Sequence, residues 1–116
     1  MSFEPDETLF RRIIVEVEDK QGFLHRGLSL TSLTREVLSN RSYVSHCINF
    51  YSGLSVPDFI NSYRIRYIQE CFDGGRKDPV PIQYRCGFSS DASYIRNFRR
   101  FTGYSPKEWQ VKNGFY

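Results

Sequence analysis

At 116 residues, the chain has room for one small domain or for two very small ones that share a core. Hydrophobic residues make up 40% of it and aromatic residues 16%, enough to bury a core, which excludes a wholly disordered chain. No apolar run approaches the roughly 18 residues of a membrane span, and the N-terminus carries no signal-peptide pattern, so we expect a cytoplasmic protein that does not enter a membrane.

The net charge of +3 is unevenly distributed along the chain. Residues 1–74 carry 8 Lys and Arg against 10 Asp and Glu, a balance of −2, whereas residues 75–116 carry 8 against 3, a balance of +5. This asymmetry favours a polyanionic partner that contacts mainly the C-terminal part. A merely solvated surface is also compatible with charges of this size.

Two helices are predicted in the first third of the chain. The first follows a short tail of residues 1–5, runs from about residue 6 to residue 20 and ends at Gln21-Gly22. Its apolar side chains form one stripe at helical spacing, namely Phe10, Ile13, Ile14 and Val17. The second runs from about Leu30 to Leu38 and, at about two turns, is too short to be stable without tertiary packing.

A tight turn separates the second helix from a third helix over about residues 41–52. Ser39-Asn40 ends the one helix and offers a side-chain cap to the next. The predicted inward face of the third helix consists of Val44, Cys47, Ile48 and Tyr51. Its predicted outward face consists of Arg41, Ser42, Ser45, His46 and Asn49. This is the helix-turn-helix pattern, in which the second helix lies in the major groove of DNA, although amphipathic helix pairs without that role are common.

A longer helix is predicted to connect this unit to the rest of the chain. Gly53 caps the third helix with a left-handed backbone, Pro57-Asp58 opens the long helix, and Gly74-Gly75 closes it. About sixteen residues at 1.5 Å per residue span roughly 24 Å. We therefore interpret this helix as a connecting rod.

The segment after the long helix repeats the arrangement of the first unit. Asp78-Pro79-Val80-Pro81-Ile82 opens a short helix that ends at Gly87, and Ser89-Ser90 caps a helix over about residues 91–102. The predicted buried face of that helix consists of Tyr94, Phe98 and Phe101. Its predicted outward face consists of Asp91, Ala92, Ile95, Arg96 and Arg99.

The two units are related by an internal repeat with an offset of fifty residues. The stretch Tyr51-Ser52-Gly53-Leu54-Ser55-Val56-Pro57-Asp58-Phe59 reappears as Phe101-Thr102-Gly103-Tyr104-Ser105-Pro106-Lys107-Glu108-Trp109. Aromatic, hydroxyl, glycine, serine and acidic positions correspond, and the match extends back over the preceding helix. It predicts a duplicated structural unit and a final short helix that begins at Pro106.

From Leu28 to Trp109, about seventy per cent of its length, the chain resembles the DNA-binding domain of the AraC/XylS family of bacterial transcription regulators. The first part of the resemblance consists of Ser42-Tyr43-Val44-Ser45-His46-Cys47-Ile48, Gly53, Phe59, Ile60 and Arg64-Ile65. The second and more specific part consists of Gly87-Phe88-Ser89-Ser90, Arg96-Asn97-Phe98, Phe101-Thr102-Gly103 and Ser105-Pro106.

The resemblance implies an all-α fold of about seven helices, in which two helix-turn-helix subdomains are joined by a linker helix. The first subdomain and its leading helix would occupy residues 6–56, the linker helix residues 57–74 and the second subdomain residues 75–116. Such a domain places one recognition helix in each of two successive major-groove segments, about 34 Å apart. The implied partners are double-stranded DNA, RNA polymerase and a sensor or dimerisation domain outside this chain.

Both subdomains depart from the family's pattern. In the first, the departures are Leu38 for a common Gly, Thr34 for a small residue, His46 for Arg and Asn49-Phe50 for two basic residues. In the second, Gln83 occupies the usual Ala position. We therefore expect most of the affinity for DNA to come from the second subdomain, through Arg96, Arg99 and Arg100.

The candidate DNA contacts are base-facing or phosphate-facing. Arg96 is the strongest candidate, because an arginine can donate two hydrogen bonds to guanine O6 and N7, worth about 1–3 kcal/mol of discrimination. Asp91 would accept from a cytosine amino group, and Ala92 and Ile95 would contact thymine methyl groups. In the first subdomain the base-facing candidates are Arg41, Ser42, Ser45, His46 and Asn49. The phosphate-facing candidates are Ser39, Arg64, Ser89, Ser90, Arg100 and Lys107.

Three classes of function are compatible with these features. We prefer a sequence-specific transcription regulator. The alternative is a protein-interaction module that keeps the fold but has weak or lost DNA readout, which the weakly basic first recognition helix favours. An enzyme is not expected, and neither is a metal or another cofactor. Cys47, Cys71 and Cys86 form no CxxC pair, and His25 and His46 have neither metal-ligand spacing nor a nucleophile partner.

Overall fold

A computed structural model describes residues 5–73 and 81–114 of the chain. Its regular structure is helical, and these residues contain no strand, which confirms the expected all-α fold. None of their helices is both long enough and apolar enough to cross a membrane. The expected end of the long helix at Gly74-Gly75 and the expected start of the next at Asp78-Pro79-Val80 lie outside the described residues.

The chain divides into two compact units, Met1–Ile60 and Asn61–Tyr116. The boundary falls inside the long helix α4 (Val56–Asp73), so the first turn of α4 belongs to unit 1 and the rest to unit 2. The predicted linker helix is thus shared between the two units.

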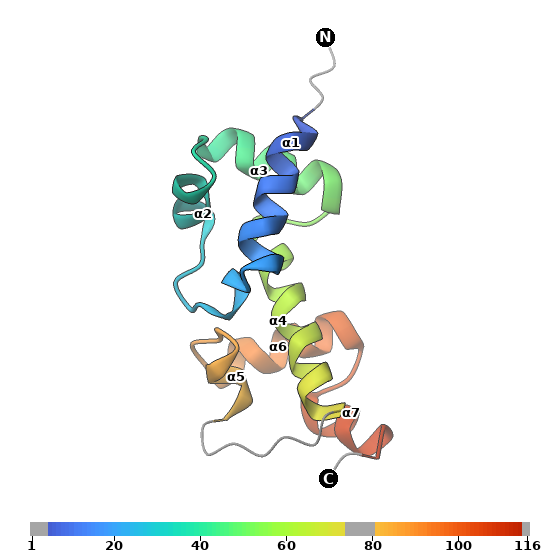
Figure 1. The fold of residues 1–116 in the computed structure, drawn as a ribbon. Coiled ribbons are helices and arrows are strands. Elements are labelled where there is room, and N and C mark those ends of the chain that lie inside the picture. Colours follow the sequence, from blue (N-terminus) through green and yellow to red (C-terminus); the bar gives the residue numbers. More distant parts are fainter. Residues whose placement is uncertain (1–4, 74–80, 115–116) are drawn as a thin grey trace. The chain divides into compact units, whose positions relative to one another are not determined.

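Unit 1 is built on three α-helices that precede α4 (Figure 1). They are α1 (Glu7–Ile14), α2 (Leu30–Glu36) and α3 (Arg41–Ser52). A π-helical turn, η1 (Val15–Asp19), continues α1, so the first predicted helix is confirmed over nearly its whole length. A short 3-10 turn, η2 (Gly22–Leu24), follows. Both α1 and α2 pack against α3.

The apolar stripe predicted for the first helix is only partly correct. Ile13 and Val17 are fully buried, and Leu9 joins them in the core. Phe10 and Ile14 are half-buried. The buried face of this helix is therefore centred on Leu9, Ile13 and Val17, part of a turn away from the predicted stripe.

Tyr51 on α3 is also more exposed than predicted. Val44, Cys47 and Ile48 are buried as expected, whereas Tyr51 keeps 38% of its surface exposed. Its ring stacks on Phe10, with centroids 4.7 Å apart, and its hydroxyl donates a hydrogen bond of 3.0 Å to the carbonyl oxygen of Pro5. An aromatic ring with a polar tip suits such a boundary position.

The repeated stretch builds the same turn in both units. Ser52 donates to the carbonyl oxygen of Ile48 and accepts from the amide of Leu54, at 2.5 and 3.1 Å. In unit 2, Thr102 makes the corresponding bonds within its own turn, at 2.7 and 3.1 Å. The glycine that follows has positive φ in each copy, 73° at Gly53 and 83° at Gly103. The hydroxyl and the glycine of the repeat are thus explained by helix termination.

A serine then begins the next helix in each unit. Ser55 accepts a hydrogen bond of 3.3 Å from the amide of Asp58 at the start of α4. Ser105 accepts one of 3.1 Å from the amide of Glu108 at the start of α7 (Pro106–Lys112). These N-caps satisfy amides that have no partner inside the helix.

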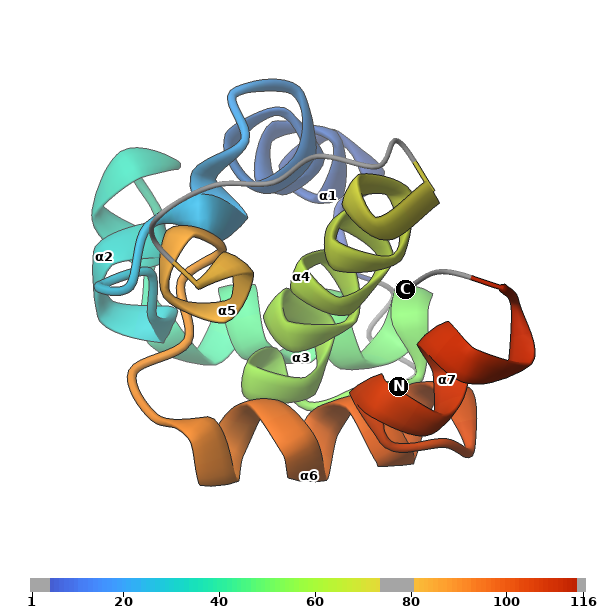
Figure 2. The same ribbon diagram turned by 90° about the horizontal axis from the view of Figure 1, so that it is seen from below.

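Unit 2 packs around the inner face of α6 (Asp91–Thr102), beside α4 and α7 (Figure 2). The ring of Phe98 lies 5.9 Å from that of Tyr94, 6.3 Å from that of Phe72 and 6.1 Å from that of Trp109. Tyr94 and Phe98 are buried as predicted, and Phe101 is half-buried. The predicted short helix before the turn is α5 (Ile82–Arg85).

The turn that precedes α3 is one residue shorter, from its left-handed residue to the N-cap, than the turn that precedes α6. In unit 1 the left-handed residue is Leu38, with φ of 54°, and the N-cap Asn40 follows two positions later. In unit 2 it is Gly87, with φ of 93°, and the N-cap Ser90 follows three positions later. The left-handed backbone explains why Gly is common in the family at the position of Leu38, because a β-carbon is strained at positive φ.

We predict that Gly103→Ala lowers the free energy of unfolding by about 1 kcal/mol, because it forces a side chain into left-handed backbone. Chemical denaturation followed by circular dichroism measures the change. Gly27→Ala is the matched control, since a β-carbon at either glycine would have no neighbour within 4 Å, and Gly27 lacks the positive φ. Equal stability changes in the two variants would contradict the backbone explanation.

Leu38→Gly is predicted to do the opposite and raise the free energy of unfolding by about 0.5–1 kcal/mol. The substitution relieves the left-handed strain and loses little packing, because Leu38 is 86% exposed. Arg35→Gly, at an exposed helical position of α2, serves as control and lowers stability by about 1 kcal/mol. A destabilised Leu38→Gly protein would show that the leucine makes a contribution that outweighs its backbone strain.

Candidate nucleic-acid interface

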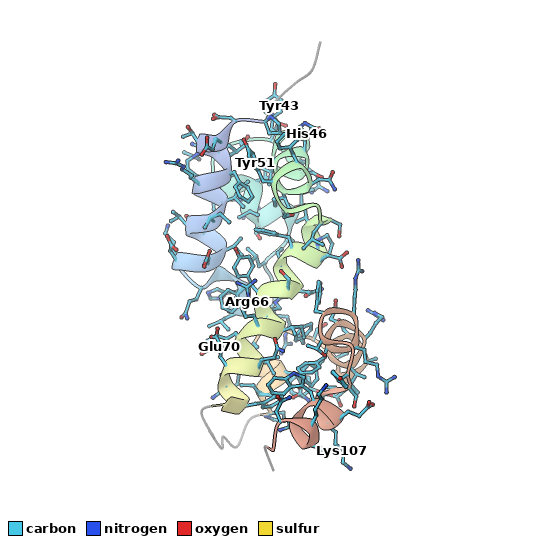
Figure 3. All side chains as sticks on the ribbon, turned by 90° about the vertical axis from the view of Figure 1, so that its right-hand side faces the viewer. Tyr43, His46, Tyr51, Arg66, Glu70 and Lys107 are labelled. Atoms are coloured by element: carbon cyan, nitrogen blue, oxygen red, sulfur yellow. The ribbon has the colours of Figure 1, made fainter. Side chains whose placement is uncertain are left out.

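The outward face of α3 is exposed and carries little charge. Arg41, Ser42, His46 and Asn49 are exposed, and Ser45 is half-buried. Two of its longer side chains are engaged within unit 1: the Arg41 guanidinium donates to the Thr31 hydroxyl, and the Asn49 amide donates to the Leu54 carbonyl oxygen at 3.5 Å. His46 and Tyr43 project from the helix into solvent (Figure 3).

Aromatic side chains flank this polar face. Tyr43 is 51% exposed and Phe50 is 54% exposed. The Phe50 ring lies 6.4 Å from that of His46 and 5.0 Å, edge to face, from that of Tyr51. The face of α3 is therefore mixed polar and aromatic, with Arg41 as its one charged residue.

The outward face of α6 has a different character. Asp91, Ala92, Ile95, Arg96, Arg99 and Arg100 are all exposed, as predicted for the first five. In the described part of the chain, no hydrogen bond or ion pair holds the Arg96 side chain. Arg99 pairs with Glu108 at 3.7 Å, but both side chains are about 60% exposed, and such surface pairs contribute little. The guanidinium of Arg100 lies 5.8 Å from the centroid of the Phe101 ring.

Asp91 at the start of α6 is tied to α5. Its Oδ1 accepts hydrogen bonds from the Tyr84 hydroxyl at 2.7 Å and from the Gln83 amide at 2.9 Å. These bonds lower the pKa of the Asp91 carboxyl below its ordinary value. The residue at the family's usual Ala position, Gln83, thus has a structural role that the sequence did not reveal.

Arg64 does not lie where a phosphate contact needs it. Only 7% of its surface is exposed, and its Nη1 donates to Asn61 Oδ1 at 3.0 Å. Its guanidinium lies 5.7 Å from the centroid of the Phe88 ring, and burial lowers its pKa. The inclusion of Arg64 among phosphate-facing residues is corrected on this ground. Arg64 lies four residues from Ile60 and four from Ile68, which are both buried. This helical spacing puts the three residues on one face and could have predicted the burial of Arg64 from the sequence.

The buried polar groups around Arg64 also hold α6. Asn61 on α4 donates to Asn97 Oδ1 at 3.4 Å, and the Asn97 amide donates to the carbonyl oxygen of Ser93 at 2.8 Å. Asn97 is 6% exposed, so the network is shielded from water. It links two helices of unit 2 by directional bonds beside the aromatic core.

The serines near the turns have different roles from one another. The N-caps of α3 and α6 are Asn40 and Ser90, which accept from the amides of Tyr43 and Ser93 at 3.0 and 3.2 Å. Within the pair Ser39-Asn40, the expected cap of α3 is thus supplied by Asn40. Ser39 is half-buried, while Ser89 is exposed. Lys107 on α7 is exposed and points away from the core of unit 2 (Figure 3).

The charge of the two units differs. Residues 1–60 carry 6 Lys and Arg against 8 Asp and Glu, a balance of −2. Residues 61–116 carry 10 against 5, a balance of +5. Three arginines of unit 2 lie exposed on α6 alone, at positions 96, 99 and 100. This is the largest concentration of exposed positive charge on one helix of the described residues.

No site for a metal ion is formed by His, Cys, Asp or Glu within residues 5–73 and 81–114. All three cysteines are free, with Cys47 and Cys86 buried and Cys71 half-buried. Burial raises the pKa of the Cys86 thiol to about 12 and also raises that of Cys47. Such thiols are poor nucleophiles.

Comparison with known proteins shows what the chain is similar to. A family described as a helix-turn-helix domain matches residues 33–112. Uncharacterized HTH-type transcriptional regulators from Staphylococcus aureus strains MSSA476 and N315 are each 30% identical over 86 residues, or 74% of this chain. The chain spans only 12% of the length of those relatives.

Two solved structures share the fold. A protein of unknown function from Listeria innocua matches with a TM-score of 0.77 at 21% identity, covering 89% of this chain and 95% of that one. The C-terminal domain of AraT, a response regulator from Geobacillus stearothermophilus, matches with a TM-score of 0.70 at 17% identity, covering 95% and 88%. At these identities the likeness shows the fold alone.

Asp91→Asn is predicted to reduce the loss of stability in acid. Because the folded-state pKa of Asp91 is lowered, its carboxylate stabilises the fold above its ordinary pKa of 3.8, and this contribution is lost as the pH falls through the lower folded value. Melting temperatures measured from neutral pH into this range test the effect. The wild type is expected to melt above the variant at neutral pH and to lose that advantage in acid. Glu70→Gln, another exposed carboxylate, is the control, and an identical pH response of wild type and Asp91→Asn would contradict the assignment.

Proposed function

Because the chain belongs to the AraC-type helix-turn-helix family, we propose that it binds specific sequences of double-stranded DNA by placing α3 and α6 in successive major-groove segments. The family and its HTH-type relatives indicate a transcription regulator rather than an enzyme. The described helices supply the two pairs of helix and turn that such a mode of binding requires.

The observation that carries the proposal is the outward face of α6. Arg96 is exposed in the middle of the helix and is not held by another side chain of the described residues, so its guanidinium is available to a base edge. Its inner neighbours Asn97 and Phe98 are buried, which fixes the rotation of the helix. We assign Arg96 to a guanine, through bonds to O6 and N7.

The other residues of α6 surround this contact. Ala92 and Ile95 are exposed apolar residues suited to thymine methyl groups. We assign Asp91 to the support of the α5–α6 turn instead of to cytosine, because its Oδ1 already accepts two hydrogen bonds. Arg99 can exchange its exposed pair with Glu108 for a contact to DNA.

We assign phosphate contacts to residues that position the protein without reading sequence. Arg100 and Lys107 supply exposed positive charge, and Ser39, Ser89 and Ser90 supply hydroxyl groups near the turns. Arg64 is excluded from this set by its burial.

The first recognition helix is proposed to contribute less affinity. Ser42, Ser45 and His46 have short or medium reach, while Arg41 and Asn49 must first give up bonds to Thr31 and to the Leu54 carbonyl oxygen. Unit 1 also lacks the positive charge of unit 2. Its role is to add sequence preference at the neighbouring groove segment.

The proposed setting is the cytoplasm, where the chain would regulate transcription by contact with RNA polymerase. A sensor or dimerisation domain outside this chain is a further proposed partner. The greater length of the HTH-type relatives supports this partner, because most of each relative lies outside the matched region.

A second candidate function is a protein-interaction module with weak DNA readout. The exposed aromatic residues Tyr43 and Phe50 beside the sparsely charged face of α3 favour it. Selection of bound duplexes from a random pool separates the two functions. A regulator yields a defined site and an affinity that falls steeply with salt, whereas an interaction module yields neither.

On the selected duplex, Arg96→Ala is predicted to weaken binding by about 1–3 kcal/mol and to relax the preference at one base pair. Quantitative binding to duplexes substituted at each position gives both quantities. Arg66→Ala is the control, because Arg66 is an exposed arginine on α4 that is not part of the outward face of α6 and whose guanidinium lies 5.5 Å from the Tyr63 ring. If Arg96→Ala leaves affinity and preference unchanged, the assignment of Arg96 is wrong.

A further inference from the structure

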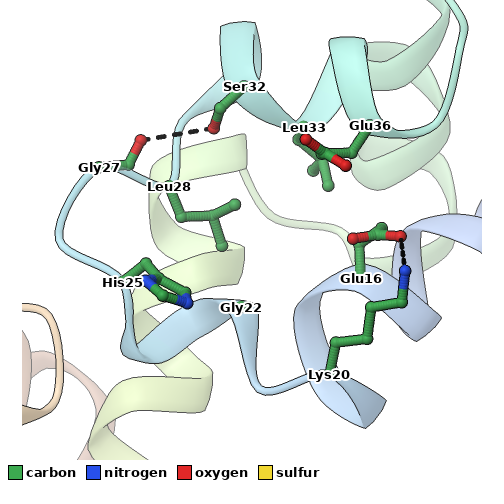
Figure 4. Close-up of a pocket in the computed structure, with 9 residues that line it drawn as sticks. All are labelled: Glu16, Lys20, Gly22, His25, Gly27, Leu28, Ser32, Leu33 and Glu36. Carbon is green, nitrogen blue, oxygen red and sulfur yellow. Dashed lines mark hydrogen bonds and ion pairs between the residues drawn. The ribbon is translucent and has the colours of Figure 1, made fainter.

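An ion pair between Arg99 and Glu108 joins the outward face of α6 to the start of α7. The guanidinium and the carboxylate lie 3.7 Å apart, and their side chains are 62% and 60% exposed. In unit 1, by contrast, Lys20 and Glu16 lie four residues apart at η1, and their charged groups are only 2.6 Å apart beside a hollow of about 350 Å³ (Figure 4). The pair in unit 2 is therefore the looser of the two, and it crosses between helices.

The backbone at the start of α7 holds Glu108 near α6. The Ser105 hydroxyl caps α7 by accepting a hydrogen bond of 3.1 Å from the Glu108 amide. Glu108 is the third residue of this helix, which packs against α6. Because the cap fixes the first turn of α7, the Glu108 carboxylate stays within reach of the Arg99 guanidinium.

Glu108 has a second partner within its own helix. Ser105 and Glu108 stand at the spacing of a capping box, in which the acid at the third helical position bonds to the backbone amide of the N-cap residue. At α2 the reciprocal bond is formed, since the Ser29 amide donates to the Ser32 hydroxyl at 2.9 Å. At α7, in the described residues, only the bond to the Ser105 hydroxyl is formed, and the Glu108 carboxylate pairs with Arg99. The Ser105 amide is therefore open to the carboxylate once Arg99 moves away.

The internal repeat shows that an ion pair at this place is particular to unit 2. Fifty residues earlier, Ser55 accepts a hydrogen bond of 3.3 Å from the amide of Asp58, which is the counterpart of Glu108. The counterpart of Arg99 is Asn49, whose amide donates to the Leu54 carbonyl oxygen at 3.5 Å. Because Asn49 carries no charge, the acid of unit 1 has no cation at the corresponding position.

We propose that Glu108 is a positioning residue that controls how much Arg99 contributes to DNA binding. The inference rests on the proposed function, in which Arg99 belongs to the DNA-facing side of α6. Without DNA, Glu108 neutralises Arg99 and holds it toward α7. A phosphate or a base edge displaces the carboxylate, which then bonds to the Ser105 amide and completes the capping box. The exposed pair is weak enough to exchange, but a carboxylate beside the DNA reduces the positive charge of this surface.

Glu108→Gln removes the ion pair and keeps the helix cap, because glutamine is uncharged and also forms a capping box. On a duplex selected by the wild type, the variant is expected to bind about threefold more tightly. The slope of its affinity against salt, on logarithmic axes, is expected to steepen by up to about 0.9, the contribution of one phosphate contact. Equal or weaker binding by Glu108→Gln would overturn the proposal.

A double-mutant cycle with Arg99→Gln separates the pair from a general effect of charge. In the Arg99→Gln background, Glu108→Gln is expected to change the affinity by less than about 1.5-fold, because the side chain that it would release is absent. Asp58→Asn is the matched control, since it removes the corresponding acid of unit 1, and its effect is expected to be the same in both backgrounds. Equal effects of Glu108→Gln in the two backgrounds would overturn the proposal.

Hydrogen exchange of the Ser105 amide, followed by NMR, tests the exchange of partners. In the wild type this amide is expected to exchange more slowly in the DNA complex than in the free protein, because it gains a hydrogen bond. In the complex of Glu108→Ala, which lacks the carboxylate, this slowing is expected to be absent. Equal slowing in the two complexes would show that DNA itself shields the amide and would overturn the capping step.

A failure of this inference is distinguishable from a failure of the proposed function. If no duplex is selected from a random pool, the proposed function is wrong, and the role of Glu108 is wrong with it. If the wild type binds a selected duplex and the cycle shows no coupling between Arg99 and Glu108, only the role of Glu108 is overturned. Circular dichroism verifies that each variant is folded.

Discussion

The burial of one face of α6 fixes the orientation of every side chain on the opposite face. Phe98 is enclosed by the rings of Tyr94, Phe72 and Trp109, and the neighbouring Asn97 is hydrogen-bonded to α4. An aromatic core resists rotation because its rings interlock, and the polar bond adds a directional constraint. Arg96 is therefore held toward solvent, with no hydrogen bond or ion pair to another of the described residues. The proposed DNA contact depends on this packing as well as on the two hydrogen bonds that an arginine can donate to guanine.

The two units show how one backbone design can carry two surface chemistries. Both units end the recognition helix in the same way: a hydroxyl side chain makes the same hydrogen bonds, a glycine has positive φ, and a serine then caps the next helix. The outward positions do not form the core, so their residue types can differ between the units without loss of the shared turn. Arginines can therefore occupy α6 while serines, a histidine and flanking aromatic residues occupy α3. This asymmetry is why we assign affinity mainly to unit 2, and why a protein contact on α3 is a reasonable second candidate.

Buried polar groups give unit 2 its internal geometry. A guanidinium such as that of Arg64 costs free energy to bury and is stabilised only by good hydrogen bonds and by a ring nearby. Asn61 and Phe88 supply these. Asp91 plays a comparable part at the surface, where it joins the start of α6 to α5. In unit 1, by contrast, α1 and α2 pack on α3.

The sequence by itself determined the helices, the repeat and the family, because these depend on neighbours within a few residues. Asn40 and Ser90 cap helices within the predicted pairs Ser39-Asn40 and Ser89-Ser90, and the glycines of the repeat end the helices before them. Helical periodicity also predicted exposed positions on α3 and α6, and all of them except the half-buried Ser45 are exposed. Only the tertiary structure decided which polar residues are free to act. Arg64 on α4 is buried beside Phe88, and Asp91 on α6 accepts bonds from Tyr84 and Gln83 on α5. These contacts join separate elements, and no local pattern encodes which elements meet.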